Sequence, residues 1–449
     1  MLGNQYQPKT KTLVISLLFA LIPLAANAGQ GQGSSANLSR LVVVGDSLSA
    51  GVQNFSLLDS QQPHGYASVI ARQAGTLLFL PLVPYPGAPN VLQLESLGPP
   101  PVIGQAQGSL PPIPRDDPFL LPTNVSVPGI TVAQALTMRP SLTPSADPVQ
   151  GWATIVLGFP SLFLGLKPTQ IELAKFLHPT TMIEWLGNND ALVPALLGQL
   201  PALTPIATFA ANYKQVLDEL STTHATLITA NIPDVTEIAF FTSAQRIADR
   251  TGLPLQTITS ILGIGAGDYL RITAESYVDK ILTGQMPGPV PDACPSPLAA
   301  LSSSPVPCRL TAADAATIRS DISCYNDVIA AQAAAHGALL VDAHALVDRI
   351  YTNGYQVNNQ NLTTDFLGGL FSLDGIHPTN TGYGVIANYF IDAMNQSLRT
   401  GIPAADIAAI AASDPLVFPS NSGLSSRSVR AAQAPSACVA PQSIGAPTS

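Results

Sequence analysis

The chain has 449 residues and a formal net charge of −9 at pH 7, with 10% charged and 46% hydrophobic residues. A chain this acidic is unsuited to binding nucleic acid or anionic lipid, because both attract basic surfaces. Its hydrophobic content is enough for a large buried core and for some exposed apolar surface, which suits an apolar substrate or partner.

The first 28 residues have the pattern of an export signal. Lys9 and Lys11 precede an apolar run over 13–26, and Ala26-Asn27-Ala28 has the small-x-small form that a signal peptidase cuts. We therefore predict cleavage after Ala28 and a secreted or periplasmic mature protein. Cleavage leaves 17 basic and 28 acidic residues, a net charge of −11, and no transmembrane segment, since no later stretch is long and apolar enough.

The four cysteines are an even number in a chain predicted to be exported, which favours disulfides. Their spacing does not match the usual zinc-binding pairs. We favour a bond between Cys294 and Cys308, which would close a loop rich in proline and serine. Cys324 could pair instead with Cys308 or with Cys438, and the sequence does not choose between these connectivities.

The first half of the chain begins with a buried strand over 41–44 and a helix over 64–74. Thirteen prolines then fall within 81–128, which predicts a long ordered arm rather than a pair of strands. The arm ends in an alternating, strand-like segment just before Pro128, and a helix follows over 131–136.

The second half continues to alternate between helices and short apolar strands. Its predicted helices are 169–177, 209–220, 311–335 and a closing one around 386–393, and its predicted strands are 180–186, 225–232 and 338–341. Residues 236–290 read as a mostly helical insertion.

This alternation predicts an α/β fold with a parallel sheet and helices on both faces. The length favours one large domain over 29–400, with insertions at about 81–122 and 236–310. Serine, alanine, proline and glycine dominate the end of the chain, so we expect 401–449 to be a low-complexity, disordered tail.

Polar residues with catalytic potential follow the predicted strands or precede the last helix. In a parallel sheet the carboxyl ends of the strands share one edge, so these residues can meet in one cleft. Ser47 would be a nucleophile, His377 its base, and Asp374 the carboxylate that orients the imidazole. The N–H groups of Gly129 and Ser47 and the side-chain amide of Asn189 would form the oxyanion hole.

Each of these residues has a plainer interpretation when taken alone. Ser47 could be a helix N-cap, Gly129 a turn residue, Asn189 a turn or cap, and His377 an ordinary loop histidine. Their combination at one sheet edge favours catalysis. Among the other histidines only His344, just beyond the last strand, is a serious rival for the base. We prefer His377 because its three-residue spacing from the carboxylate lets both side chains point to one site.

Four segments of the sequence, in order, resemble the signature blocks of the GDSL-type SGNH hydrolases. They are Val44-Gly45-Asp46-Ser47-Leu48-Ser49, Pro128-Gly129, Gly187-Asn188-Asn189-Asp190 and Asp374-Gly375-Ile376-His377-Pro378. The resemblance extends over about 41–397 and is loosest in the two insertions. It implies a three-layer α/β/α sandwich, flavodoxin-like, with a mostly parallel central sheet. It also implies the same triad and Gly/Asn oxyanion hole, and ester hydrolysis.

We therefore expect an exported serine esterase or lipase that acts on a small-molecule ester or lipid and needs no cofactor. The apolar segments 157–166, 191–203 and 236–290 either line an acyl-binding groove, form a lid, or are ordinary packing. Two alternatives stay open, a carbohydrate O-acetyl esterase and a catalytically silent binding protein of the same fold. A metal-dependent hydrolase is disfavoured, because no histidine and carboxylate cluster has ligand spacing.

Overall fold

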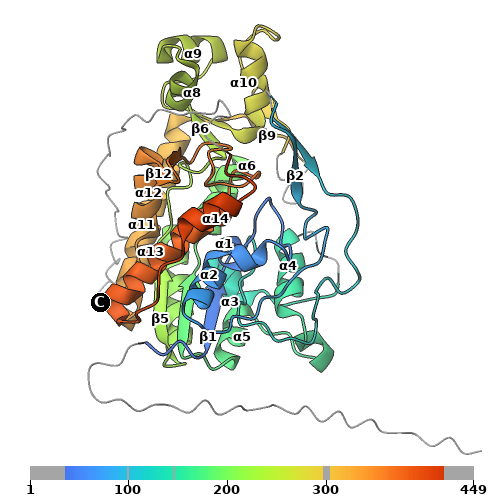
Figure 1. Ribbon diagram of the computed structural model, residues 1–449, viewed down its shortest axis with the longest axis vertical. Helices are drawn as coiled ribbons and strands as arrows, with labels where there is room; N and C mark the ends of the chain where they lie inside the picture. The colour runs from blue at the N-terminus through green and yellow to red at the C-terminus, as the bar shows by residue number, and fades with distance from the viewer. Residues whose placement is uncertain (1–35, 99–100, 144, 146, 297–303, 419–449) are drawn as a thin grey trace, which may run out of the picture. The chain divides into compact units, whose positions relative to one another are not determined.

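The computed structural model describes residues 36–98, 101–143, 145, 147–296 and 304–418, so the predicted signal segment lies outside the described part. Its central sheet has four parallel strands in the order β1–β4–β5–β11 (Figure 1). These strands are β1 (Leu41–Gly45), β4 (Thr181–Trp185), β5 (Thr226–Ala230) and β11 (Leu339–Val341). The strands are short, and β1 and β4 are buried along their whole length, as expected for a sheet covered on both faces.

The segment before Pro128 extends this sheet beyond β1. The N–H groups of Val125 and Val127 donate to the carbonyls of Val43 (2.9 Å) and Gly45 (3.0 Å), so the segment runs parallel to β1. The strand-like pattern there is borne out as an extended edge segment. It delivers Gly129 to the same end of the sheet as Ser47.

Side chains of β1 point alternately into two separate cores. Val42 and Val44 pack in one, and Leu41 and Val43 in the other. The first core is covered by α3 (Val132–Thr137), α4 (Pro148–Leu157), α5 (Gln170–Phe176), α6 (Asn188–Leu197), α7 (Ile206–Ser221) and α11 (Ala312–His336). The second is covered by α2 (Tyr66–Gln73), α12 (Ala343–Asn353), α13 (Asn380–Leu398) and α14 (Ile407–Ser413). The expected three-layer α/β/α sandwich with a parallel sheet is therefore confirmed.

The expectation of no strand pair in the proline-rich arm is wrong. β2 (Leu92–Ser96) and β3 (Val102–Gln105) form an antiparallel pair there. Both strands are free of proline, and three consecutive prolines stand between them in the sequence. Proline disrupts a ladder only where its missing N–H is needed, so the number of prolines mattered less than their positions.

The insertion at 236–310 has a small hydrophobic core of its own, which includes Ile247, Ile258 and Val278. The predicted helices are present as α8 (Ala244–Thr251), α9 (Leu255–Leu262) and α10 (Glu275–Leu282), which Figure 1 shows grouped together. Short strands that the sequence did not indicate lie before, between and after them, namely β6 (Phe241–Ser243), β7 (Tyr269–Arg271), β8 (Ala293–Cys294), β9 (Val306–Pro307) and β10 (Arg309–Leu310).

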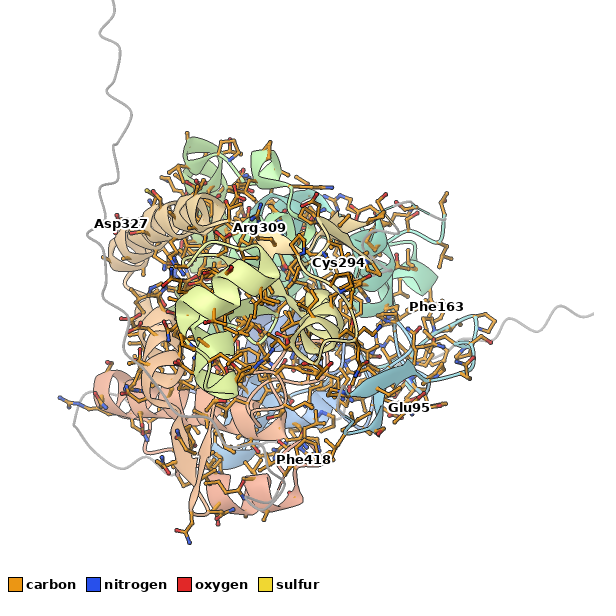
Figure 2. The ribbon with its side chains drawn as sticks, turned by 90° about the horizontal axis from the view of Figure 1, so that it is seen from above. Glu95, Phe163, Cys294, Arg309, Asp327 and Phe418 are labelled. Carbon is orange, nitrogen blue, oxygen red and sulfur yellow. A yellow bond between two sulfur atoms is a disulfide. The ribbon has the colours of Figure 1, made fainter. Side chains whose placement is uncertain are left out.

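A disulfide joins Cys294 to Cys308 within this insertion, as we favoured (Figure 2 labels Cys294). Cys308 is therefore not the partner of Cys324. The remaining cysteine, Cys438, lies outside the described residues.

Regular structure continues past residue 400, where the sequence had placed the start of the tail. Asp414 follows α14 and accepts hydrogen bonds from the N–H (2.7 Å) and hydroxyl (2.8 Å) of Thr381 at the start of α13. The expected boundary is therefore too early, and residues 419–449 lie outside the described part.

The other elements are α1 (Ser47–Ala50), the hairpin of β12 (Tyr355–Val357) and β13 (Gln360–Leu362), and the 3-10 turns Gln62–His64, Ser161–Leu164, Leu200–Ala202 and Ile272–Ala274. Within the described ranges, no helix combines the length and the apolar composition of a membrane span.

Candidate functional site

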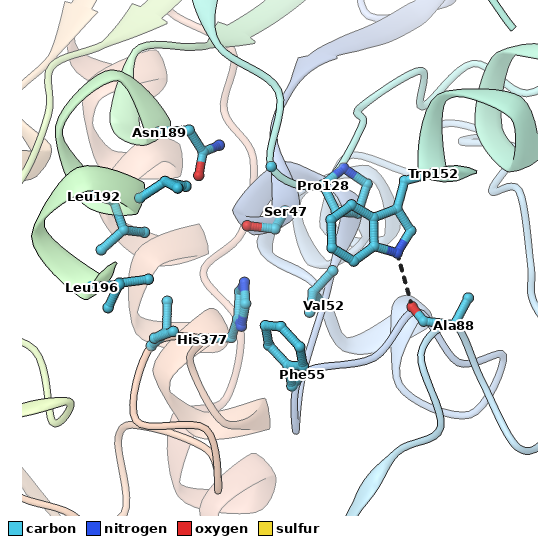
Figure 3. A pocket seen from close by; sticks show the side chains of 13 residues that line it. Ser47, Val52, Phe55, Ala88, Pro128, Trp152, Asn189, Leu192, Leu196 and His377 are labelled. Carbon is cyan, nitrogen blue, oxygen red and sulfur yellow. Dashed lines mark hydrogen bonds between the residues drawn. The ribbon is translucent and has the colours of Figure 1, made fainter. Parts of the chain in front are cut away.

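Ser47 is the first residue of α1 and is separated by one residue from Gly45, which ends the strand β1. The cap of this helix is Asp46, whose Oδ1 accepts the N–H of Leu48 at 3.0 Å, so the interpretation of Ser47 as an N-cap is wrong. The other oxygen of Asp46 accepts from the amide of Asn188 at 2.8 Å. Burial raises the pKa of Asp46 to about 6. Figure 3 shows the Ser47 hydroxyl directed into the space between Asn189 and His377.

His377 and Asp374 lie in the loop before α13, and their side chains are in direct contact. Nδ1 of His377 is 2.8 Å from Oδ2 of Asp374, and both residues are buried. Burial alone would raise the pKa of Asp374, but the nearby His377 and the N–H groups of Ile376 and His377 lower it below its usual value. The carboxylate thus stays anionic and holds Nδ1. Nε2 of His377 is buried, and no group in the described part of the chain hydrogen-bonds to it.

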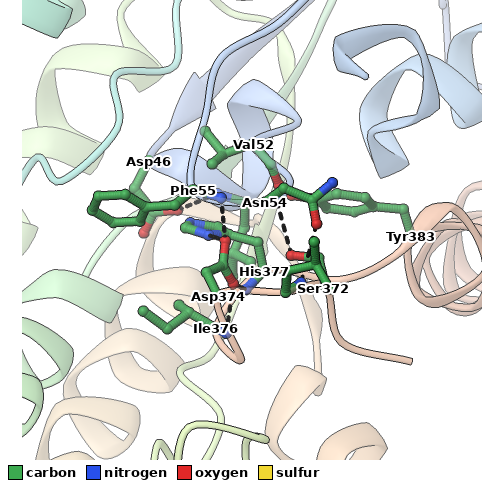
Figure 4. A network of polar contacts seen from close by, with 11 residues as sticks. Asp46, Val52, Asn54, Phe55, Ser372, Asp374, Ile376, His377 and Tyr383 are labelled. Atoms are coloured by element: carbon green, nitrogen blue, oxygen red, sulfur yellow. Dashed lines mark hydrogen bonds and ion pairs between the residues drawn. The ribbon is translucent and has the colours of Figure 1, made fainter. Parts of the chain in front are cut away.

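A tight loop from a distant part of the sequence supports this carboxylate (Figure 4). The N–H of Phe55 donates to Oδ2 of Asp374 at 2.5 Å, and the N–H of Asn54 donates to Oγ of Ser372 at 3.0 Å. Asn54 also accepts the N–H of Leu373 through its side chain, at 3.0 Å. Both loop residues have left-handed backbone conformations, with φ of 50° and 57°. Asparagine tolerates a positive φ but phenylalanine is strained by it, and these hydrogen bonds hold the loop in this conformation.

The two predicted oxyanion-hole residues outside α1 are held against each other. Gly129 has φ of +75°, and a Cβ there would lie 3.1 Å from Val149 and 3.2 Å from Trp152, so the position requires glycine. The amide of Asn189 donates one proton to the carbonyl of Ile130 at 3.0 Å, which fixes the side chain and leaves its second proton available.

Asp190, the next residue along α6, strengthens this link. Its Oδ2 accepts the N–H of Val132 at 3.0 Å, and its Oδ1 accepts the hydroxyl of Thr204 at 2.8 Å. Burial raises the pKa of Asp190 to about 6. The start of α6 and the start of α3 are thus bound to each other just behind the site.

Ser47, Gly129, Asn189 and His377 line one cavity of about 40 Å³, with Asp374 behind His377. The rest of its lining is apolar and consists of Val52, Phe55, Ala88, Pro128, Trp152, Leu192, Val193, Leu196 and Ile376. The structure therefore brings together all the residues that the sequence singled out for acyl transfer. Among the described residues, no cluster of histidine, cysteine and carboxylate side chains could hold a metal ion.

The rival base and most of the apolar segments lie away from this cavity. Nδ1 of His344 contacts the carbonyl of Ile232 at 3.0 Å, and His344 does not line the cavity. Of the three segments proposed for a groove or lid, only 191–203 contributes lining residues. Sequence reasoning missed Phe55 and Trp152, and an isolated aromatic residue gives no signal that it faces a cavity.

No protein-family model matches this chain, and no curated protein matches it. Solved structures with a similar arrangement include phospholipase A1 from Streptomyces albidoflavus (12% identity, TM-score 0.35, 80% of this chain and 99% of that chain). They also include a GDSL-like lipase from Parabacteroides merdae (10%, 0.34, 80% and 99%) and an extracellular lipase from Streptomyces rimosus (12%, 0.32, 80% and 98%). At these identities and TM-scores we draw nothing about the chemistry of this chain from the likeness.

Proposed function

We propose that this chain is an exported serine carboxylester hydrolase with Ser47 as nucleophile, His377 as base and Asp374 as the orienting carboxylate. The observation that carries the proposal is the state of the His377 ring. Its Nδ1 is occupied by Asp374, while its buried Nε2 has no partner in the described part of the chain and lines the same cavity as Ser47. A base in this arrangement has one nitrogen fixed and the other free to take a proton.

In this mechanism Oγ of Ser47 attacks the carbonyl carbon of the ester, and its proton moves to Nε2 of His377. Asp374 stabilises the imidazolium that results. The N–H groups of Ser47 and Gly129 and the amide of Asn189 would stabilise the oxyanion. The alcohol then leaves with the proton from Nε2, and water hydrolyses the acyl-enzyme with His377 again as base.

The size and the lining of the cavity favour a short, apolar acyl group as the part of the substrate that binds there. Its volume of about 40 Å³ is far below the ~300–1,000 Å³ of drug-sized pockets and has room for only a few water molecules. Among the described residues its polar side chains are Ser47, Asn189 and His377, which the chemistry uses, and Trp152, whose indole N–H donates to the carbonyl of Ala88 at 3.2 Å. Within the described part of the chain, no further polar side chain lines the cavity to bind sugar hydroxyls, which disfavours the carbohydrate O-acetyl esterase.

Two features support export of this hydrolase to a secreted or periplasmic location. The first 28 residues have the pattern of a signal peptide with cleavage after Ala28. The bond between Cys294 and Cys308 belongs to an oxidising compartment. The proposal needs no cofactor and no nucleic-acid partner.

Hydrolysis of p-nitrophenyl esters, from acetyl to octanoyl, by the wild-type protein and by Ser47→Ala tests the proposal. We expect activity on short esters and its loss in the variant. The matched control is Ser49→Ala, two residues away, whose hydroxyl contacts Tyr66 (2.8 Å) and does not line the cavity. A wild-type protein inactive on every ester, or a fully active Ser47→Ala, would overturn the proposal and favour a binding protein of this fold.

A further inference from the structure

Arg271, at the end of β7, is fully buried yet binds no carboxylate among the described residues (1% exposed). Its guanidinium instead donates to four main-chain carbonyls. Nη2 and Nε donate to Ala195 (2.9 Å) and Leu196 (3.1 Å), and Nη1 donates to Pro307 (2.7 Å) and Arg309 (2.8 Å). Burial lowers the pKa of Arg271 to about 10, so it remains charged at neutral pH. Hydrogen bonds from a charged donor are stronger than those between neutral groups, so the guanidinium links the two segments that it reaches.

One of these segments is the last turn of α6, which forms a wall of the cavity. The carbonyls of a last helical turn lack partners within the helix, and the helix dipole favours a cation there. Leu192, Val193 and Leu196 of this helix line the cavity. Leu196 therefore places its side chain against the acyl site while Arg271 holds its carbonyl.

The other segment is anchored by the disulfide. Pro307 and Arg309 flank Cys308, which is bonded to Cys294, and the main-chain N–H of Arg271 donates to the carbonyl of Cys308 at 2.9 Å. Figure 2 labels Arg309 on this segment and Cys294, which is bonded to it through Cys308. The end of α6 lies close against it, because a Cβ on Gly198 would be 2.8 Å from Pro307.

We propose that Arg271 is a positioning residue that fixes the α6 wall of the cavity to the disulfide-bonded segment 306–310, and that this link sets the acyl-chain selectivity of the enzyme. The inference rests on the proposed ester hydrolysis. Without the link the carbonyl of Leu196 loses Arg271 as its partner and the carbonyl of Ala195 keeps only the N–H of Gly198 (3.3 Å), so the wall shifts outward and longer acyl chains enter. The catalytic groups lie on other segments or at the opposite end of α6, so the chemical step is preserved.

The variant Arg271→Lys tests this link. Lysine keeps the charge, but its single ammonium group cannot replace a planar fork that reaches both segments. We expect the ratio of kcat/KM for p-nitrophenyl octanoate to that for the acetate to rise about tenfold, mainly through the KM for octanoate. The kcat for acetate should stay at the wild-type value.

The matched control is Arg115→Lys. Arg115 is also buried and donates to two main-chain carbonyls, those of Phe159 (2.6 Å) and Leu120 (2.8 Å), but neither of these residues lines the cavity. This variant should lose stability without a change in the octanoate-to-acetate ratio.

The double variant Cys294→Ser, Cys308→Ser loosens the far end of the link and keeps the test decisive if Arg271→Lys does not fold. We expect a change of the ratio in the same direction, and a smaller added effect of Arg271→Lys in that background than in the wild type. An unchanged ratio in folded variants, or an equal loss on every ester, would overturn the inference. If the activity still depends on Ser47, either of these results leaves the proposed function standing. If the protein with Ser47 intact is inactive on every ester, both the proposed function and this inference fail.

Discussion

The main-chain N–H of Phe55 donates a 2.5 Å hydrogen bond to Oδ2 of Asp374, the same oxygen that contacts Nδ1 of His377. The ring of Phe55 also lines the cavity. One residue thus contributes to the wall of the acyl site and to the orientation of the carboxylate behind the base. Phe55 and the preceding Asn54 both have left-handed backbone conformations. These conformations turn the N–H of Phe55 toward Asp374.

Substitution of Asn54 by alanine should lower kcat for p-nitrophenyl acetate about 10-fold to 100-fold while KM changes little. The change removes the acceptor for the N–H of Leu373, and it replaces a residue that tolerates positive φ by one that does not. The loop would then hold Asp374 less precisely. Steady-state kinetics with separate kcat and KM values measure the effect.

The control for backbone strain is Asn359→Ala. Asn359 has φ of 60° and is exposed in the turn between β12 and β13, away from Asp374. Asn359→Ala should lower the free energy of unfolding by about as much as Asn54→Ala does, and it should leave kcat unchanged. Equal kcat losses in both variants would mean that Asn54 acts only through stability.

Exchange of Asp374 for asparagine should lower kcat about 10⁴-fold, the size of effect expected when a triad histidine adopts the wrong tautomer. Asparagine can still accept the N–H groups of Ile376 and His377 through one oxygen. Its amide nitrogen, however, cannot accept from Phe55 or from Nδ1 of His377. Pre-steady-state kinetics should show that acylation itself slows. A loss of less than about tenfold would be inconsistent with an orienting role.

The sequence predicted the strand-end residues well because the signals there are local. A run of β-branched residues that ends in Gly45 indicates both a buried strand and the turn that exposes Ser47. The parallel order of the sheet then brings Ser47, Gly129 and Asn189 to one edge, and the loop before α13 adds His377 there. No contact between distant segments had to be known.

The supporting groups could not be predicted because their partners are far away in the chain. The N–H of Phe55 meets a carboxylate 319 residues later, and Arg271 binds carbonyls 75 and 76 residues earlier. Main-chain groups carry no residue-specific signal, so nothing in the sequence pointed to these bonds. The strands β2 and β3 are hidden for another reason, because the arm around them is rich in proline although neither strand contains one.

Replacement of Asn189 by alanine should lower kcat about 10²-fold to 10³-fold, as expected for loss of one oxyanion donor. KM should change little, because the donor acts mainly on charge that develops in the transition state. The variant Asn189→Asp, of the same shape but without a donor, should lose at least as much. Rates on p-nitrophenyl acetate measure both.

Asn388→Ala is a matched control for this change. The amide of Asn388 on α13 donates to the carbonyl of Ala405 at 2.9 Å, a helix-borne bond like that of Asn189, but it lies outside the cavity. It should leave kcat at the wild-type value. A rise in KM with unchanged kcat for Asn189→Ala would instead assign the amide to substrate binding.

The change Glu184→Gln should flatten the dependence of stability on pH. Glu184 is fully buried on β4, where it accepts hydrogen bonds from the hydroxyls of Tyr213 and Thr229 and from the N–H of Leu186, and burial raises its pKa from 4.5 to about 7. Between these pH values the folded state holds a proton that the unfolded state has released. The free energy of unfolding therefore falls as pH rises from about 4.5 to about 7, by about 3 kcal/mol from this one group.

Urea denaturation of the wild type and of Glu184→Gln at pH 5 and pH 8 measures this contribution. The difference between the two pH values should be smaller in the variant by about 3 kcal/mol. The variant should keep part of the wild-type dependence of unfolding free energy on pH, because burial also raises the pKa of Asp46 and of Asp190 to about 6. The control Asp327→Asn, an exposed carboxylate on α11, should keep the full wild-type slope. Identical slopes in Glu184→Gln and wild type would mean that this carboxylate ionises as readily in the folded core as in the unfolded chain.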